Sequence, residues 1–324
     1  MLEELNYAKQ IEQIFKMKKA DVEREFSSCR DIEFYSYYKR FFDNPNELKE
    51  YHSELCNHIL EVTKSRKKRL LDVGAGFGLN SIYFNILGAE VVGVEIDPEK
   101  KAIFEKLLKR LVPPLKKIEM RIGDALEIDF EAEQFDAIIC CDVISHVKDL
   151  ELFLLKMYKA LAKGGFLFIR DNNNSLSLFQ KKINREIWRK AECEYKSLRK
   201  KAIKRILKTN QEDLANLLAE KTAGLYGDEI AQAVNQYLRY GKTTLPVAFK
   251  CRDPISGIYL ERDFNPFLLG KILRKFGFQT KMLRPFLLVN GRVPSIMFAA
   301  QAIKVFHPLS LFVSPIFEIL CQKI

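Results

Sequence analysis

Short, mostly apolar runs alternate with amphipathic stretches through the middle of the chain. Runs of this kind are typical of strands that are buried on both faces of a parallel sheet. Apolar residues at helical intervals fill the stretches between them. The alternation predicts an α/β fold, a Rossmann-like and mostly parallel sheet with helices on both faces. The expected strands are 69–73, 91–95, 118–122, 135–141 and 166–170, and the expected helices are 78–87, 98–111 and 150–161.

The segments on either side of this core break the alternation. The first part of the chain has apolar positions at helical spacing and few glycines or prolines, which predicts a helical cap or lid. After residue 171 a mostly helical, basic stretch is too long for an ordinary loop, so we expect an insertion. Further elements are expected at 266–276, 280–289 and 295–303. The predicted units are an N-terminal helical cap (1–66), the core (67–171), the insertion (172–262), a closing helix and strands (263–304) and an apolar C-terminal tail (305–324).

A glycine-rich turn follows the first expected strand. Gly74, Gly76 and Gly78 are spaced as G-x-G-x-G, and the second strand ends at Glu95. Glycines let backbone N–H groups approach a ligand, and a carboxylate at the end of the second strand accepts hydrogen bonds from ribose hydroxyls. The pattern therefore predicts a nucleoside-binding βαβ unit. The spacing differs from the G-x-G-x-x-G of dinucleotide enzymes, which makes a NAD-dependent enzyme the weaker reading.

Two further signatures follow in order, Phe135 to Val147 and Leu161 to Ile169. With the glycine turn, they resemble the motifs of class I S-adenosylmethionine (SAM)-dependent methyltransferases over about residues 67–171. The segment from Phe264 to Phe278 resembles the closing helix and Gly-Phe turn of the same superfamily. The stretches 225–230 and 251–262 look like those of a branch with a basic helical insertion before the closing strands.

The resemblance implies SAM as the cofactor and gives roles to individual residues. Glu95 would accept from the ribose hydroxyls, Ile96 would lie against adenine, and Asp72 would face the methionine ammonium group. The implied cofactor-binding residues are Asp72, Gly74, Ala75, Gly76, Gly78, Glu95, Ile96, Asp124, Ala125, Asp142 and Val143. Each has a structural alternative: the glycines could serve the turn alone, Glu95 could be a solvated strand end, and Asp124 could cap a turn.

His146 and Asp142 are the candidate catalytic residues. An imidazole can accept a proton at neutral pH, so His146 is a candidate general base. The alternative is a structural or cofactor-side role, because the superfamily often has His at this position whatever the substrate. Methyl transfer is an in-line displacement, so alignment of the reactants can do much of the work and no covalent nucleophile is required.

Absent motifs narrow the acceptor. The sequence after the fourth strand, Cys140-Cys141-Asp142-Val143, lacks the Asn/Asp-Pro-Pro-aromatic motif that stacks an extruded base for amine methylation. No Pro-Cys pair for attack on a pyrimidine ring and no double-glutamate loop of the protein arginine type occurs. We therefore expect a methyltransferase that acts on a small molecule, a sugar or a glycan-type acceptor, with O-methylation favoured.

The net charge of +11 is concentrated in the insertion. Between Lys181 and Lys208 there are twelve Lys and Arg residues and three acidic residues. Such a run can bind the phosphate of an acceptor or an anionic lipid, or it can be a solvated helical face. It also keeps open an RNA-binding protein or an RNA methyltransferase. A further alternative is a SAM-binding partner subunit without catalysis.

Cysteine usage and hydropathy bear on the compartment. The seven cysteines form no C-x-x-C pair, and with four histidines no zinc spacing appears, so we expect reduced thiols and no metal. The first residues lack a signal-peptide pattern, and no run reaches the roughly 18 apolar residues of a membrane span. The sequence thus predicts a cytoplasmic protein without a transmembrane segment. The apolar tail is expected to pack on the body, with contact to a membrane surface as the alternative.

Overall fold

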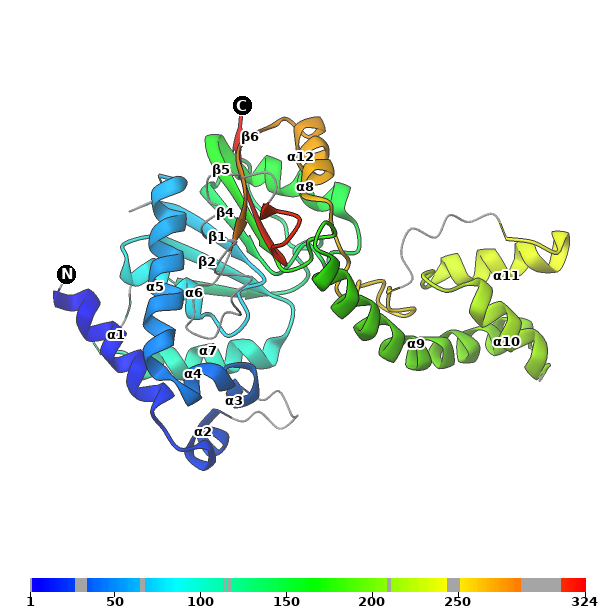
Figure 1. Cartoon of the computed structure of the whole chain (residues 1–324), viewed down its shortest axis with the longest axis horizontal. Coiled ribbons are helices and arrows are strands. Elements are labelled where there is room, and N and C mark those ends of the chain that lie inside the picture. The colour runs from blue at the N-terminus through cyan, green and yellow to red at the C-terminus, as the bar shows by residue number, and fades with distance from the viewer. Residues whose placement is uncertain are drawn as a thin grey trace.

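A computed structural model gives the arrangement of the chain. It describes residues 2–26, 34–64, 68–112, 115, 118–208, 211–243, 251–286 and 310–324. A central sheet is covered by helices on both faces, and an arm of three helices extends from the body to one side (Figure 1). The N-terminal helices lie on the side of the body away from this arm (Figure 1).

Within the described residues, seven strands form one sheet in the order β3-β2-β1-β4-β5-β7-β6. Neighbouring strands from β3 to β5 are parallel, and β7 is antiparallel to both β5 and β6. This confirms the predicted Rossmann-like, mostly parallel sheet. The strands are β1 (Arg69–Val73), β2 (Glu90–Glu95), β3 (Ile118–Ile122), β4 (Phe135–Cys141), β5 (Leu161–Asp171), β6 (Phe278–Phe286) and β7 (Ile316–Lys323).

Alternate residues along the strands are buried in two separate hydrophobic cores, one on each face of the sheet. On one face, Leu70 and Ile139 pack with α6 (Leu79–Ile86), α7 (Pro98–Lys109) and the N-terminal helices. On the other face, Leu71 and Ile138 pack with α8 (Leu150–Ala160) and α12 (Pro266–Lys275). The period of two along a strand explains why adjacent residues face opposite cores.

Five N-terminal helices pack near the glycine turn through aromatic side chains. Phe34 and Tyr38 lie 5.3 and 5.6 Å from the ring of Phe77, between ring centroids. Phe77 is part of the glycine turn, so this contact joins the helices directly to the end of β1. The helices are α1 (Leu2–Phe15), α2 (Lys19–Phe26), α3 (Phe34–Tyr37), α4 (Lys39–Asp43) and α5 (Pro45–Val62).

The arm consists of α9 (Leu178–Leu207), α10 (Glu212–Lys221) and α11 (Asp228–Tyr240), all within the predicted insertion. Helix α9 begins beside the sheet at Ser177, whose hydroxyl accepts a hydrogen bond from the N–H of Gln180. The outer half of the arm has a small core of its own that includes Ile203, Leu218 and Val234. The arm is therefore held together by its own apolar contacts.

The end of the chain differs from the sequence-based expectation. The strand expected over 295–303 falls outside the described residues, and the last strand of the sheet is instead β7, within the predicted tail. Pro315 and Glu318 interrupt the apolar pattern there, but Pro315 precedes the strand and Glu318 has charged partners inside the sheet. The strand expected at 166–170 also begins earlier, because residues 161–165 are part of β5. No helix in the described part of the chain has the length and apolar content needed to cross a membrane.

Candidate functional site

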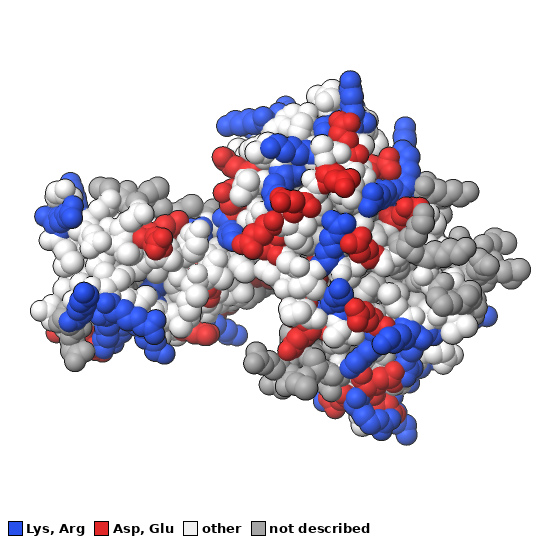
Figure 2. All heavy atoms as spheres, turned by 180° about the vertical axis from the view of Figure 1, so that it is seen from behind, with Lys and Arg blue, Asp and Glu red and all other residues white. Residues whose placement is uncertain are grey.

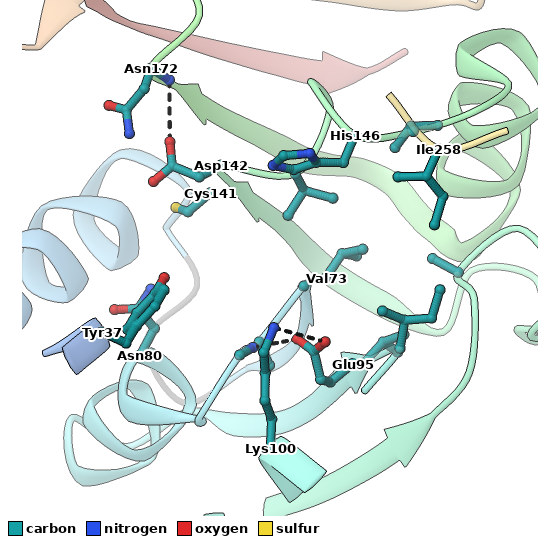
Figure 3. A pocket seen from close by; sticks show the side chains of 18 of the residues that line it. Tyr37, Val73, Asn80, Glu95, Lys100, Cys141, Asp142, His146, Asn172 and Ile258 are labelled. Carbon is teal, nitrogen blue, oxygen red and sulfur yellow. Dashed lines mark hydrogen bonds and ion pairs between the residues drawn. The ribbon is translucent and has the colours of Figure 1, made fainter. Parts of the chain in front are cut away.

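A cavity of about 690 Å³ lies at the carboxyl ends of the parallel strands. Its lining includes Val73 at the end of β1, Glu95 at the end of β2 and Cys141 at the end of β4 (Figure 3). Ligands of open α/β sheets bind at this edge, where neighbouring strand order reverses. The cavity therefore lies where the glycine turn predicts a ligand.

The three glycines of the turn all have positive φ, but they have different surroundings. A Cβ at Gly74 would collide with Val143, and one at Gly78 would collide with Phe104 on α7. A Cβ at Gly76 would meet nothing within 4 Å, and Gly76 lines the cavity. Gly74 and Gly78 thus allow close packing, whereas Gly76 leaves room beside the backbone for a ligand.

Glu95 is held in one position at the end of β2. Its side chain is only 4% exposed, the N–H of Gly76 donates to Oε2 at 2.8 Å, and the N–H of Asp97 donates to Oε1 at 3.1 Å. Lys100 Nζ lies 3.4 Å from Oε1 (Figure 3). An ionised carboxylate has about four acceptor sites, so Glu95 keeps capacity for further donors from the cavity.

The loops after β2 and β3 form another part of the wall. Ile96 lines the cavity and is 52% exposed, a high value for a large apolar side chain. Asp124 accepts from the N–H of Leu126 at 2.9 Å and lies 3.2 Å from Lys148 Nζ. Ala125 lines the cavity beside it. This wall combines an apolar surface with a fixed carboxylate.

Asp142 lies directly after β4 and faces the cavity. Its φ is +56°, a left-handed conformation that is uncommon for a residue other than glycine. Oδ1 accepts from the N–H of Asn172 at 3.2 Å (Figure 3). Desolvation by the surrounding cavity walls, followed by the negative charge of Asp171, raises the pKa of Asp142 to about 7. Near neutral pH the carboxyl group can therefore hold or release a proton.

His146 follows on the same loop, with its ring fixed by a backbone group. Nδ1 lies 3.0 Å from the carbonyl oxygen of Tyr259, so Nδ1 is the donor nitrogen of the neutral ring. Nε2 then carries a lone pair, and it lies 3.9 Å from Oε1 of Glu261. Tyr259 and Glu261 come from the segment between α11 and α12, whose Ile258 faces His146 in Figure 3.

The sequence of this core matches one known family. Residues 71–169 match the family model described as a methyltransferase domain. We therefore call residues 71–169 the methyltransferase domain. The matched residues run from β1 to β5 and include every strand end described above.

The chain is also similar to O-methyltransferases of ubiquinone biosynthesis. The chain is 40% identical over 110 residues to the mitochondrial ubiquinone biosynthesis O-methyltransferase of Homo sapiens, which is 33% of this chain and 29% of that protein. It is 30% identical over 137 residues to the ubiquinone biosynthesis O-methyltransferase of Rhizobium etli. The aligned residues make up 41% of this chain and 54% of that relative. The chain thus spans only about a third to a half of these relatives. A solved structure of a SAM-dependent methyltransferase from Methanosarcina mazei aligns with 82% of this chain. The alignment includes 97% of that structure, with 16% sequence identity and a TM-score of 0.47.

Two of the residues predicted to bind cofactor are not in the cavity lining of the methyltransferase domain. Gly78 packs against α7, as described above. Asp72 is 2% exposed and accepts a hydrogen bond from Ser81 Oγ at 2.6 Å. Burial, with a smaller contribution from the charge of Glu95, raises the pKa of Asp72 to about 7. The predicted contact of Asp72 with an ammonium group stays a prediction. The other predicted residues line one cavity: Gly74, Ala75, Gly76, Glu95, Ile96, Asp124, Ala125, Asp142, Val143 and His146.

The methyltransferase domain does not form the whole cavity. Tyr37, Arg40 and Tyr51 from the N-terminal helices also line it, and the role of this segment as a lid stays a prediction. Sequence reasoning missed Asn172 and Glu261, because no local motif marks either residue.

The basic part of the insertion lies away from this cavity. No residue of α9, α10 or α11 that the structure describes is part of the lining. Several lysines of α9 form ion pairs with α10 instead, such as Lys196 with Glu220 at 2.6 Å. Lys and Arg gather on the arm, at lower left in Figure 2. Within the described residues, no group of three or more His, Cys, Asp or Glu side chains could hold a metal ion.

Proposed function

We propose that the protein is a SAM-dependent methyltransferase that transfers a methyl group to a hydroxyl oxygen of a small-molecule, sugar or glycan-type acceptor. One observation carries the proposal: the fixed carboxylate of Glu95 and the open Nε2 of His146 face the same cavity. The first suits a ribose and the second suits a hydroxyl that must lose its proton. The relatives, which are O-methyltransferases of ubiquinone biosynthesis, support the same reaction class.

The cavity walls fit the parts of the proposed cofactor. Glu95 would accept from the ribose hydroxyls, because its carboxylate is held by Gly76 and Asp97 and has acceptor capacity left. Adenine would lie against Ile96, with its exocyclic amine near Asp124 and Ala125. The methionine part would pass over Gly76, where a side chain is absent and the space is open.

The chain's own residues would then align the acceptor and receive its proton. When bound, SAM supplies an electrophilic methyl group. His146 would accept the hydroxyl proton at Nε2, since its Nδ1 is occupied by the Tyr259 carbonyl. Holding both reactants in the cavity at attack distance can contribute roughly 7–11 kcal/mol to lowering the barrier.

The charges around His146 favour an acceptor without a negative charge. Asp142 and Glu261 both line this part of the cavity, and a phosphate beside them would be repelled. The ion-paired lysines of α9 are not in the lining, so we do not favour a phosphate-bearing acceptor or an RNA. A cytoplasmic location stays a prediction from the sequence.

The experiment is methyl transfer from isotopically labelled SAM to a panel of phenols, catechols, alcohols and sugars. We expect label in an ether product together with S-adenosylhomocysteine, and protection from thermal unfolding by SAM but not by NAD. Gly76→Arg, which fills the open space beside the turn, should abolish both effects. Absence of binding heat with both SAM and S-adenosylhomocysteine would overturn the proposal.

A further inference from the structure

Glu261 has an unusual backbone for a cavity residue. It precedes α12, and its φ of +53° is in the left-handed region. For a residue other than glycine this conformation costs roughly 1–2 kcal/mol, and it persists only where surrounding contacts fix the backbone. Its side chain is 32% exposed and lines the same cavity as His146.

Contacts from two directions fix this backbone. Trp188 on α9 donates through Nε1 to the carbonyl oxygens of Leu260 and Glu261, at 2.8 and 3.1 Å. On the other side, the N–H of Arg262 donates to the carbonyl oxygen of Ser145 at 3.1 Å. The insertion and the loop after β4 thus hold Glu261 between them.

The carboxylate of Glu261 is also held. Asn173 Nδ2 donates to Oε2 at 2.7 Å and to Oδ1 of Asp171 at 2.9 Å. Asn184 on α9 donates through Nδ2 to Oδ1 of Asn173 at 2.8 Å. Asn173 and Asn184 are at most 1% exposed, so water does not compete for their hydrogen bonds and the geometry of these two amides is fixed. Oε2 is occupied, and Oε1 is the oxygen nearer to His146.

The two side chains form an ordered pair. The distance from Oε1 of Glu261 to Nε2 of His146 is 3.9 Å, and the opposite nitrogen of the ring is bound to Tyr259. Asp142 also faces this part of the cavity, but its raised pKa leaves it partly protonated near neutral pH. Lys148 is paired with Asp124. Glu261 is therefore the carboxylate placed to act on His146.

We propose that Glu261 is a positioning residue that stabilises the protonated form of His146 during methyl transfer. This rests on the proposed function. The acceptor hydroxyl gives its proton to Nε2 of His146 while its oxygen forms a bond to the methyl carbon. The bond between that carbon and sulfur breaks, and its electron pair stays on sulfur. The imidazolium is then compensated by the Glu261 carboxylate. The helical insertion, through Trp188 and Asn184, thus completes the proton-accepting pair.

The experiment measures kcat, KM for SAM and S-adenosylhomocysteine affinity in Glu261→Gln, Glu261→Asp, His146→Gln and the double variant. General bases contribute about 10²- to 10⁴-fold, so we expect Glu261→Gln to lower kcat by about 10- to 100-fold with KM for SAM unchanged. Glu261→Asp should recover part of this loss. The double variant should be no slower than His146→Gln, because residues that act as one unit are not additive. Glu220→Gln on α10 is the matched control.

The outcomes separate the two proposals. Unchanged kcat in Glu261→Gln, or losses that multiply in the double variant, would overturn the role of Glu261 while leaving methyl transfer intact. Failure of the wild type to bind S-adenosylhomocysteine would overturn the proposed function instead. The neutral tautomer of His146, read from ¹⁵N spectra of the wild type, is a test that needs no variant to fold. We expect the Nδ1–H form, and an Nε2–H form would overturn the pair.

Discussion

The guanidinium of Arg170 and the carboxylate of Glu318 form a buried ion pair between β5 and β7. Arg170 Nε donates to Oε1 at 2.9 Å, and Arg284 on β6 donates to Oε2 at 2.7 Å. Arg284 also contacts His58 on α5. Glu318 is fully buried, so its charge is compensated entirely by protein groups. One carboxylate therefore connects three strands and the last N-terminal helix.

Removing this carboxylate should be costly. Glu318→Ala leaves buried Arg170 without its partner, and we expect a loss of about 3–5 kcal/mol in the free energy of unfolding. Urea denaturation measures it. Glu186→Ala, which breaks the exposed pair of Glu186 with Arg189, is the control and should cost at most about 1 kcal/mol. Equal losses in the two variants would contradict this.

The ion pairs of Glu318 should also make the free energy of unfolding decrease at low pH. Burial disfavours the charged form of Glu318, but the charges of Arg170 and Arg284 outweigh it and lower its pKa. A lowered pKa contributes stability above the ordinary value, and this is lost as pH falls through the folded-state value. Stability measured at pH 7 and pH 3 should therefore differ less in Glu318→Gln than in the wild type.

Asp72 should change the pH dependence of stability in the opposite direction to Glu318, because its pKa is raised. Its pKa is raised to about 7 by burial, so between its ordinary value of 3.8 and 7 the folded state holds a proton that the unfolded state has released. The free energy of unfolding then falls as pH rises through this range and levels off above it. In Asp72→Asn, the fall between pH 5 and pH 8 should be smaller by about 3 kcal/mol. Asp213→Asn on α10 is the matched control.

Glu95 should control cofactor affinity with little effect on folding of the arm or lid. Hydrogen bonds to a charged group contribute about 1.5–3 kcal/mol, so Glu95→Gln should weaken SAM binding by roughly 10- to 150-fold. Isothermal titration calorimetry measures this. Glu105→Gln, at an exposed position of α7, should bind SAM like the wild type. Wild-type affinity in Glu95→Gln would remove Glu95 from the binding site.

The glycines of the turn should separate into a binding position and a packing position. In Gly76→Ala the added methyl group enters the open cavity, so we expect weaker SAM binding and a stability loss of only about 1–2 kcal/mol from the positive φ. In Gly78→Ala the methyl group collides with Phe104, so the loss of stability should be larger. Thermal melts with and without S-adenosylhomocysteine distinguish the two; similar melting temperatures without ligand would contradict the assignment.

Much of the core was predictable because its signals are local. The strands 118–122 and 135–141 match β3 and β4, since alternating apolar residues in the first and a mostly apolar run in the second define them without any distant partner. The glycine turn and Glu95 were found through their fixed spacing, which reflects one compact βαβ unit.

The remaining features depend on distant contacts. Glu261 approaches His146 across 115 positions of sequence, through a path that includes the whole arm. No periodicity in the segment 251–264 indicates that its backbone is held by Trp188. In the same way, a charged residue in the middle of β7 argues against a buried strand until Arg170 and Arg284 are known to meet it.

The position of β7 in the sheet affects the order in which the strands can pair during folding. It is the last of the described strands in sequence, yet it lies between β5 and β6. During synthesis, the edge of β5 therefore stays unpaired until residues 316–323 have left the ribosome. Strand β6 cannot join the sheet before then, because it pairs with β7. Among the described strands, β7 is the pairing partner of both β5 and β6, so this part of the sheet forms only after β7 has been synthesised.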